Sequence, residues 1–312
     1  MKRFKKLVTV LLIMSLMVVF TGCSNKTKAA TSATTSVPTK DREGNEIVIP
    51  KKVDKIISLA PSTTQVLIDL GLKDNIVAVD TYSVGLFGDD STLPTFDIMN
   101  PDAEKLASLD ADIIFATGMS KTDGDDPLKL LKDMGACVTY IPTSASIAEI
   151  REDILFIANA TDKSAEGQKL IDTMDKEIAK YTAIGKTIKD KKSVYFEIAA
   201  APDMYSFGSD VFLNEILDII GAKNILADQK GWVAVAAENV VAANPDVILT
   251  NVDYIDNPVD EIKSRAGFSE IAAVKNSAVY QIDNKSSSYA NHNIVKAMKE
   301  IAVAIYPEEY NK

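Results

Sequence analysis

Short apolar runs and helical apolar stripes alternate along the chain, and this alternation predicts an α/β protein whose sheets are mostly parallel. The runs, which are rich in Val and Ile as buried strands are, lie at residues 47–49, 55–60, 75–80, 112–117, 137–142, 193–200, 246–252 and 278–282. Apolar residues three or four positions apart predict helices between them, at residues 62–70, 127–134, 147–160, 164–188, 210–220, 259–265 and 293–305.

The first helix carries a start signal and a stop signal. Ser62 is followed three residues later by Gln65, which predicts a capping box, and Gly71 predicts the end of the helix. We therefore expect the helix to open at Ser62, directly after a strand.

One segment occurs twice. Residues 103–116 (AEKLASLDADIIFA) and residues 237–250 (AENVVAANPDVILT) align without a gap. Each copy is typical of a short helix followed by an Asp and a strand, and the aligned identities include Ala103 with Ala237, Glu104 with Glu238, Asp112 with Asp246 and Ile114 with Ile248. Two such copies predict two similar lobes, and a chance match between two helix–strand units is the alternative.

The longest helical pattern, at residues 164–188, separates the two copies. Its apolar stripe advances in steps of three and four and consists of Leu170, Ile171, Met174, Ile178, Tyr181 and Ile184. A helix of this length spans roughly 36 Å, so it could join two lobes as one rigid strut. The predicted fold class is therefore α/β, with two doubly wound lobes at residues 41–160 and 191–312 joined by a single backbone helix within residues 161–190.

The chain begins with the pattern of an export signal. A basic start precedes an apolar stretch at residues 7–20, which is too short to span a bilayer. The basic residues are Lys2, Arg3, Lys5 and Lys6. Residues 1–22 are therefore predicted to be a signal peptide.

The sequence Phe20-Thr21-Gly22-Cys23 resembles a bacterial lipobox, although Phe20 stands where Leu is more usual. Cys23 is accordingly the predicted lipidation site, and plain secretion is the alternative. Residues 23–40 are rich in Ser, Thr, Ala and Lys, which predicts a flexible tether. We expect the protein to be lipid-anchored on the extracytoplasmic face of the cell membrane.

Charge and composition exclude several function classes. The formal net charge is −10, and it becomes −14 when the four basic residues of the signal peptide are removed, which argues against nucleic acid or anionic lipid as the main partner. A bare transition-metal binder normally needs several His with carboxylates, whereas the chain has one His. We therefore expect no metal site.

Signatures of catalysis are absent. The chain has no Gly-x-Ser-x-Gly, and Ile184-Gly185-Lys186-Thr187 lacks the first glycine of a phosphate loop because Lys180 occupies that position. If Cys23 is lipidated, Cys137 has no disulfide partner, and its place in a predicted strand favours a buried apolar filler over a nucleophile. We expect neither catalysis nor a cofactor.

Three segments resemble one protein family. They are Lys55-Ile56-Ile57-Ser58-Leu59-Ala60-Pro61-Ser62, Asn100-Pro101-Asp102-Ala103-Glu104-Lys105-Leu106, and the stretch from Gly231-Trp232 through Glu238 to Asn244-Pro245-Asp246-Val247-Ile248-Leu249. Together they are similar to the ABC-transporter substrate-binding lipoproteins that import iron–siderophore complexes, haem or cobalamin. The resemblance implies two α/β lobes joined by one long helix, a monomeric protein, and a ligand held in the cleft between the lobes.

In that family one glutamate of each lobe pairs with arginines of the membrane permease, and the residues in register here are Glu104 and Glu238. Both are expected at helix starts, where the helix dipole favours a carboxylate. Asp102 could cap the first of these helices, whereas Ala236 stands where the family often has a capping Ser. The alternative is that each Glu serves only its own helix N-terminus.

Residues that follow the strands define the predicted ligand site, because ligands of open α/β sheets bind beyond the carboxyl ends of the strands. Aromatic and small polar residues predominate there, which suits a large, partly apolar ligand. The predicted ligand-binding residues are Tyr82, Phe87, Met119, Ser120, Met204, Tyr205, Trp232, Tyr254, Tyr289 and His292. Five of them are expected to form its wall, namely Tyr82, Tyr205, Trp232, Tyr254 and Tyr289.

Charge favours some ligands over others. None of the arginines (Arg3, Arg42, Arg151 and Arg265) follows a strand, which favours a neutral hydroxamate complex or cobalamin over a strongly anionic ferric complex. Less specific cations are offered by Lys121, Lys230 and Lys285. Haem stays an alternative because His292, Met119 or a tyrosine could ligate iron, although a lone His is more often a surface or capping residue.

The predicted function is therefore capture of an iron complex, a siderophore or related metal chelate, and its delivery to the permease subunits of an ABC importer. A cobalamin- or haem-binding member of the same family is one alternative. A surface lipoprotein or sensor that does not transport is another, because a fold alone does not determine function.

Overall fold

The computed structural model describes residues 37–88, 91–121 and 125–311. These residues belong to one compact unit. The predicted signal peptide, Cys23 and most of the predicted tether lie outside the described residues. In the described part, no helix combines the length and the apolarity needed to cross a bilayer.

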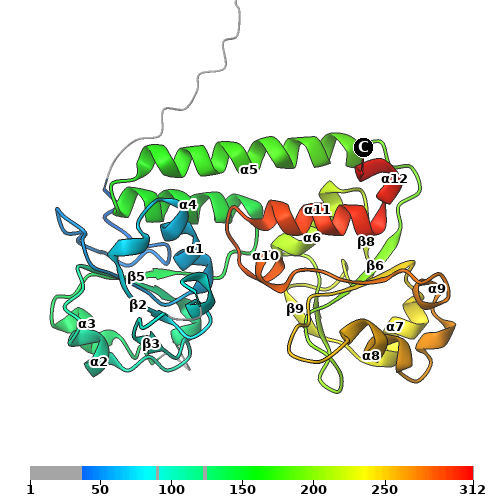
Figure 1. Ribbon diagram of the computed structural model, residues 1–312, viewed down its shortest axis with the longest axis horizontal. Coiled ribbons are helices and arrows are strands. Elements are labelled where there is room, and N and C mark those ends of the chain that lie inside the picture. Colours follow the sequence, from blue (N-terminus) through cyan, green and yellow to red (C-terminus); the bar gives the residue numbers. More distant parts are fainter. Residues whose placement is uncertain (1–36, 89–90, 122–124, 312) are drawn as a thin grey trace, which may run out of the picture. The chain divides into compact units, whose positions relative to one another are not determined.

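Two parallel sheets confirm the predicted α/β class (Figure 1). The N-terminal sheet has the order β3-β2-β1-β4-β5, with β1 at Ile56–Ser58, β2 at Ile76–Asp80, β3 at Thr95–Phe96, β4 at Ile113–Thr117 and β5 at Val138–Ile141. The C-terminal sheet has the order β11-β10-β6-β8, with β6 at Ser193–Glu197, β8 at Lys223–Asn224, β10 at Val247–Thr250 and β11 at Val279–Gln281. We call each sheet with its helices the N-terminal and the C-terminal lobe.

A small antiparallel pair accompanies the C-terminal sheet. It joins β7 (Tyr205–Phe207) to β9 (Trp232–Ala234). The sequence did not predict β3, β7, β8 or β9, because their two or three residues lie outside the longer apolar runs. The predicted strand at residues 47–49 is wrong, since Pro50 lacks the N–H that a ladder needs and Val48 is exposed.

The helices predicted from the apolar stripes and from the doubled segment are all present. The bounds of the helices are α1 Pro61–Asp69, α2 Ala103–Ala107, α3 Lys129–Asp133, α4 Ile147–Ala160, α5 Ser164–Gly185, α6 Phe212–Ile219, α7 Ala237–Ala243, α8 Pro258–Ser264, α9 Ala272–Lys275, α10 Asn284–Ser288, α11 Ile294–Ile305 and α12 Pro307–Tyr310. Helix α5 ends at Gly185, three residues earlier than predicted, and the short helices α9, α10 and α12 were not predicted. The predicted capping box is wrong, because α1 starts at Pro61 and Ser62 lies within its first turn. Proline is preorganised for that first position, so it sets the start of the helix.

The long helix α5 joins the two lobes. It packs against α4 of the N-terminal lobe and against α6 and α11 of the C-terminal lobe (Figure 1). Gly185 permits the contact with α6, because a Cβ at this position would lie 2.0 Å from the carbonyl oxygen of Ile219. One hydrophobic cluster runs from the N-terminal sheet through these helices to the C-terminal sheet, and a separate cluster covers the other face of each sheet.

The doubled segment folds in the same way in both lobes. In the N-terminal lobe the carboxylate of Asp112, just before β4, accepts hydrogen bonds from the amides of Asp54 and Lys55, both at 2.8 Å. In the C-terminal lobe the carboxylate of Asp246, just before β10, accepts a hydrogen bond of 2.8 Å from the amide of Ser193. Each aspartate therefore holds the start of its strand to the start of the neighbouring parallel strand, β1 or β6.

Candidate functional site

A cavity of about 360 Å³ lies at the carboxyl ends of the N-terminal strands. Residues 60–63 after β1, Tyr82 after β2, Thr117 at the end of β4 and residues 142–144 after β5 contribute to its wall. Helix α4 and the segment from Asn284 to Ala290 complete the lining. Its volume falls within the range of ligand pockets, roughly 300–1,000 Å³.

The structure brings three of the ten predicted ligand residues together at this cavity, namely Tyr82, Met119 and Tyr289. Two others are buried elsewhere: Ser120 donates to the carbonyl of Ile98, and Met204 lies in the core of the C-terminal lobe. Phe87 packs against the N-terminal core with Lys73 over its ring.

His292 also lies apart from the cavity lining. Its Nε2 is 2.8 Å from the carboxylate of Asp69, the last residue of α1, so the imidazole links the two lobes. Tyr205, Trp232 and Tyr254 lie in the C-terminal lobe and do not line the cavity either.

Four of the five predicted wall residues nevertheless have unusually exposed side chains. Tyr82 is 69% exposed, Tyr254 64%, Trp232 46% and Tyr205 43%. Among the described residues the other exposed large aromatic side chain is Tyr280. These four rings are thus available for stacking on a ligand, which is the usual role of exposed aromatic side chains in binding sites.

A buried carboxylate holds the backbone of Tyr82 in place. Asp80, the last residue of β2, is fully buried and accepts hydrogen bonds from the amides of Tyr82 (2.8 Å) and Ser83 (3.1 Å) and from the Ser83 hydroxyl. Burial raises the pKa of the Asp80 carboxyl. This role of Asp80 was not predicted, although an Asp before a turn at a strand end is a recognisable signal in the sequence.

Asp153 supplies the cavity wall with a carboxylate. Its side chain is 8% exposed and is held by Arg42, whose Nε lies 2.5 Å from Oδ1, and by Ser144, whose hydroxyl lies 2.6 Å from Oδ2. Burial raises the pKa of Asp153, and the bond from Arg42 opposes that rise. Lys, Arg and His are absent from the described lining, so the ion pair leaves the wall close to neutral.

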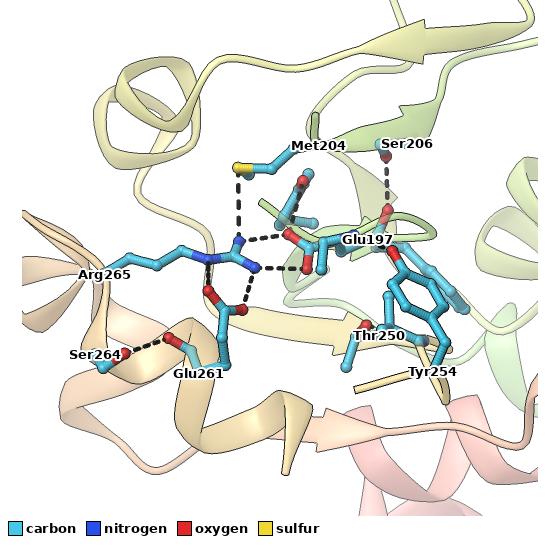
Figure 2. A network of polar contacts seen from close by, with 12 residues as sticks. Glu197, Met204, Ser206, Thr250, Tyr254, Glu261, Ser264 and Arg265 are labelled. Atoms are coloured by element: carbon cyan, nitrogen blue, oxygen red, sulfur yellow. Dashed lines mark hydrogen bonds and ion pairs between the residues drawn. The ribbon is translucent and has the colours of Figure 1, made fainter. Parts of the chain in front are cut away.

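A second buried ion-pair network lies at the end of β6 (Figure 2). Arg265 donates two hydrogen bonds to Glu197, at 2.6 and 2.9 Å, and also binds Glu261 of α8. The Arg265 and Glu197 side chains are 8% and 1% exposed. The sequence placed no arginine directly after a strand, yet this guanidinium reaches a strand end, where its carboxylate partners neutralise it.

Two of the three lysines considered as cations are also paired with acids. Lys121 binds Glu43, and Lys230 lies 3.4 Å from Asp210. Lys285 lines a separate, smaller pocket. These positions leave the aromatic and neutral character of the cavity unchanged.

Comparison with known proteins identifies the family. The model of the periplasmic binding protein family matches residues 56–286, about three quarters of the chain. The chain belongs to this family. Its members are substrate-binding proteins of ABC importers, so this periplasmic binding protein is not an enzyme.

Individual relatives support this family assignment. The binding protein is 33% identical over 311 residues to the uncharacterized ABC transporter substrate-binding lipoprotein YvrC of Bacillus subtilis, with 95% of each chain covered. It is 22% identical to a cobalamin-binding protein of Halobacterium salinarum, covering 85% of this chain and 73% of that one. A solved structure of a possible iron-binding solute-binding protein of Staphylococcus epidermidis matches with 32% identity and a TM-score of 0.70, covering 82% of this chain and all of that one.

The binding protein presents its two repeat glutamates alike. Glu104 is the second residue of α2, and Glu238 is the second residue of α7. Both are exposed, and neither carboxylate has a hydrogen-bond or ion-pair partner within the described residues. Asp102 caps α2 by accepting from the amide of Lys105 (3.0 Å), as predicted, whereas Ala236 gives α7 no side-chain cap.

The described residues contain neither a metal-binding cluster nor a reactive thiol. Across residues 37–88, 91–121 and 125–311, no three His, Cys, Asp or Glu side chains form a metal site. Cys137 is half-buried, and burial raises the pKa of its thiol to about 11, so the thiolate is scarce at neutral pH.

Proposed function

We propose that this protein captures an uncharged iron chelate, such as a ferric hydroxamate siderophore, and delivers it to an ABC importer. The observation that carries the proposal is the cavity at the strand ends, whose one carboxylate is already neutralised and whose rim includes the exposed ring of Tyr82. The Staphylococcus epidermidis protein, named as possibly iron-binding, supports an iron ligand. Cobalamin is the second candidate, because it is also a large, partly apolar ligand and gives its name to the Halobacterium relative.

A ligand screen tests this proposal. Ferrichrome, cyanocobalamin and haemin would each be added at about one hundred times the dissociation constant, where a ligand that binds only the folded state stabilises it by about 2.7 kcal/mol. For a domain of this size that corresponds to a rise in melting temperature of about 5–10 °C, measured by calorimetry. We expect the largest rise with ferrichrome. No shift with any of the three would refute the proposed ligand class.

A matched pair of variants locates the binding site in that screen. Tyr82→Ala should weaken the shift because Tyr82 lines the cavity and is mostly exposed, so its removal should spare the fold. Tyr280→Ala removes another exposed ring that does not line the cavity and should leave the shift unchanged.

We further propose that Glu104 and Glu238 bind arginines of the permease. Both carboxylates are exposed at helix starts and lack an internal partner in the described part of the chain, so they are free to form bidentate bonds with a guanidinium. The two equivalent positions, one per lobe, suit a permease that contacts both lobes.

The proposed location is the extracytoplasmic face of the membrane, through lipid on Cys23 and a tether at residues 23–40. We expect Cys23→Ser to release the protein into the medium, because the variant lacks the thiol that would carry the lipid. Fractionation of cells and medium measures this. Retention of the variant on the membrane would contradict lipidation at Cys23.

A further inference from the structure

A loop that precedes the family-matched segment packs next to the cavity. The match begins at residue 56, whereas the loop at residues 39–47 closes on itself, with the amide of Ile47 donating to the carbonyl of Thr39 at 2.9 Å. Asp41 accepts from the amide of Tyr140 in β5 at 3.0 Å, and the amide of Arg42 donates to the carbonyl of Tyr140 at 3.1 Å. These bonds fix the loop against the carboxyl end of β5, next to the cavity.

The fixed loop directs Arg42 onto the one carboxylate of the cavity wall. Arg42 itself does not line the cavity; it binds Asp153 at 2.5 Å and Glu152 at 2.8 Å. Glu152 is 60% exposed, so water screens it, whereas Asp153 is 8% exposed and depends on its bonds to Arg42 and Ser144. Removing the guanidinium would therefore leave the Asp153 carboxylate on the wall without a cation, with the Ser144 hydroxyl as its remaining partner.

We propose that Arg42 is a specificity-determining residue that makes the cavity select uncharged chelates over cationic ones. This rests on the proposed function, and it assigns the choice of ligand charge to a loop outside the matched segment. Arg42 acts through Asp153 and does not touch the ligand. A cationic chelate gains little from a carboxylate that is already paired, and an anionic chelate finds no free cation among the described lining residues.

Three ferric chelates of different charge test the proposal by isothermal titration: ferrichrome, which is uncharged, ferrioxamine B, a cation with the same hydroxamate donors, and ferric citrate, an anion. In Arg42→Gln the dissociation constant of ferrioxamine B, divided by that of ferrichrome, should fall by about tenfold, because one unpaired charge in a partly desolvated site acts strongly on a nearby ion. Arg42→Lys keeps the charge and should keep the wild-type ratio within about threefold.

Asp153→Asn should act in the opposite direction, away from ferrioxamine B and towards ferric citrate, because Arg42 then keeps only the exposed Glu152 as its partner. The double variant Arg42→Gln/Asp153→Asn has a neutral wall again, so it should bind the three chelates in the same order of affinity as the wild type. Arg151→Gln is the matched control. This arginine lies on α4, as Asp153 does, and it pairs with half-exposed Asp175, which does not line the cavity.

The outcomes separate this proposal from the proposed function. A wild-type protein that binds none of the three chelates refutes the proposed function. A wild-type protein that binds ferrichrome, with the same selectivity in folded Arg42→Gln, overturns the role of Arg42 alone. If Arg42→Gln does not fold, Asp153→Asn decides, and unchanged affinities for all three chelates overturn the proposal.

Discussion

Replacing Arg265 with alanine should lower the free energy of unfolding by about 3–5 kcal/mol, because it leaves the carboxylate of Glu197 buried without a cation. The nearest remaining partner is the hydroxyl of Tyr195, 3.3 Å from that carboxylate, and a neutral donor cannot replace a bidentate guanidinium. The melting temperature should fall by about 10 °C. Urea unfolding and calorimetry measure the two quantities.

Arg151→Ala is the control for this variant. Arg151 pairs with Asp175 through side chains that are 34% and 42% exposed, and pairs of that kind contribute about 0–1 kcal/mol. If Arg265→Ala lowered the free energy of unfolding by as little as Arg151→Ala does, the buried network would not stabilise the C-terminal lobe.

The double variant Glu104→Ala/Glu238→Ala should reduce ligand uptake by cells at least tenfold while ligand affinity stays within about twofold of wild type. Truncating one partner of a hydrogen-bonded charge pair at an interface costs about 2–5 kcal/mol, so losing two docking points should abolish productive contact with the permease. Neither glutamate lines the cavity, so binding in solution should persist. Radiolabelled uptake and titration of the purified protein measure the two effects.

Glu166→Ala controls for the loss of a helix-start carboxylate. Glu166 is an exposed acid in the first turn of α5, as Glu104 and Glu238 are in their helices. Its loss should leave uptake unchanged. Wild-type uptake in the double variant would exclude the docking role, and would favour a sensor or surface lipoprotein if ligand binding were retained.

Local patterns predicted much of the fold. Helix α4 begins at Ile147 and ends at Ala160, as its apolar stripe predicts, and Ser146 caps its start by accepting from the amide of Glu149. The placement of Tyr82 and Met119 at the cavity follows from parallel-sheet geometry, which gathers strand ends at one edge.

The ion pairs at the strand ends could not be predicted in this way. Arg42 and Asp153 are 111 residues apart, and Arg265 and Glu197 are 68 residues apart. Their contacts depend on how a loop and a helix pack against the strands, and the spacing of apolar residues along the sequence does not predict that packing. The same limit explains Met204: its position after a strand suggested a ligand contact, whereas side-chain packing turns it into the core.

The doubled segment combines residues that serve the fold with residues that do not. In each lobe the aspartate before the strand accepts from an amide at the start of the neighbouring strand, Asp112 from Lys55 and Asp246 from Ser193. The helix cap differs between the copies, because Asp102 caps α2 whereas Ala236 gives α7 no side-chain cap. The carboxylates of Glu104 and Glu238 make no contact that the described residues reveal, so the fold itself gives no reason for an acid at both positions, and the proposed docking role supplies one.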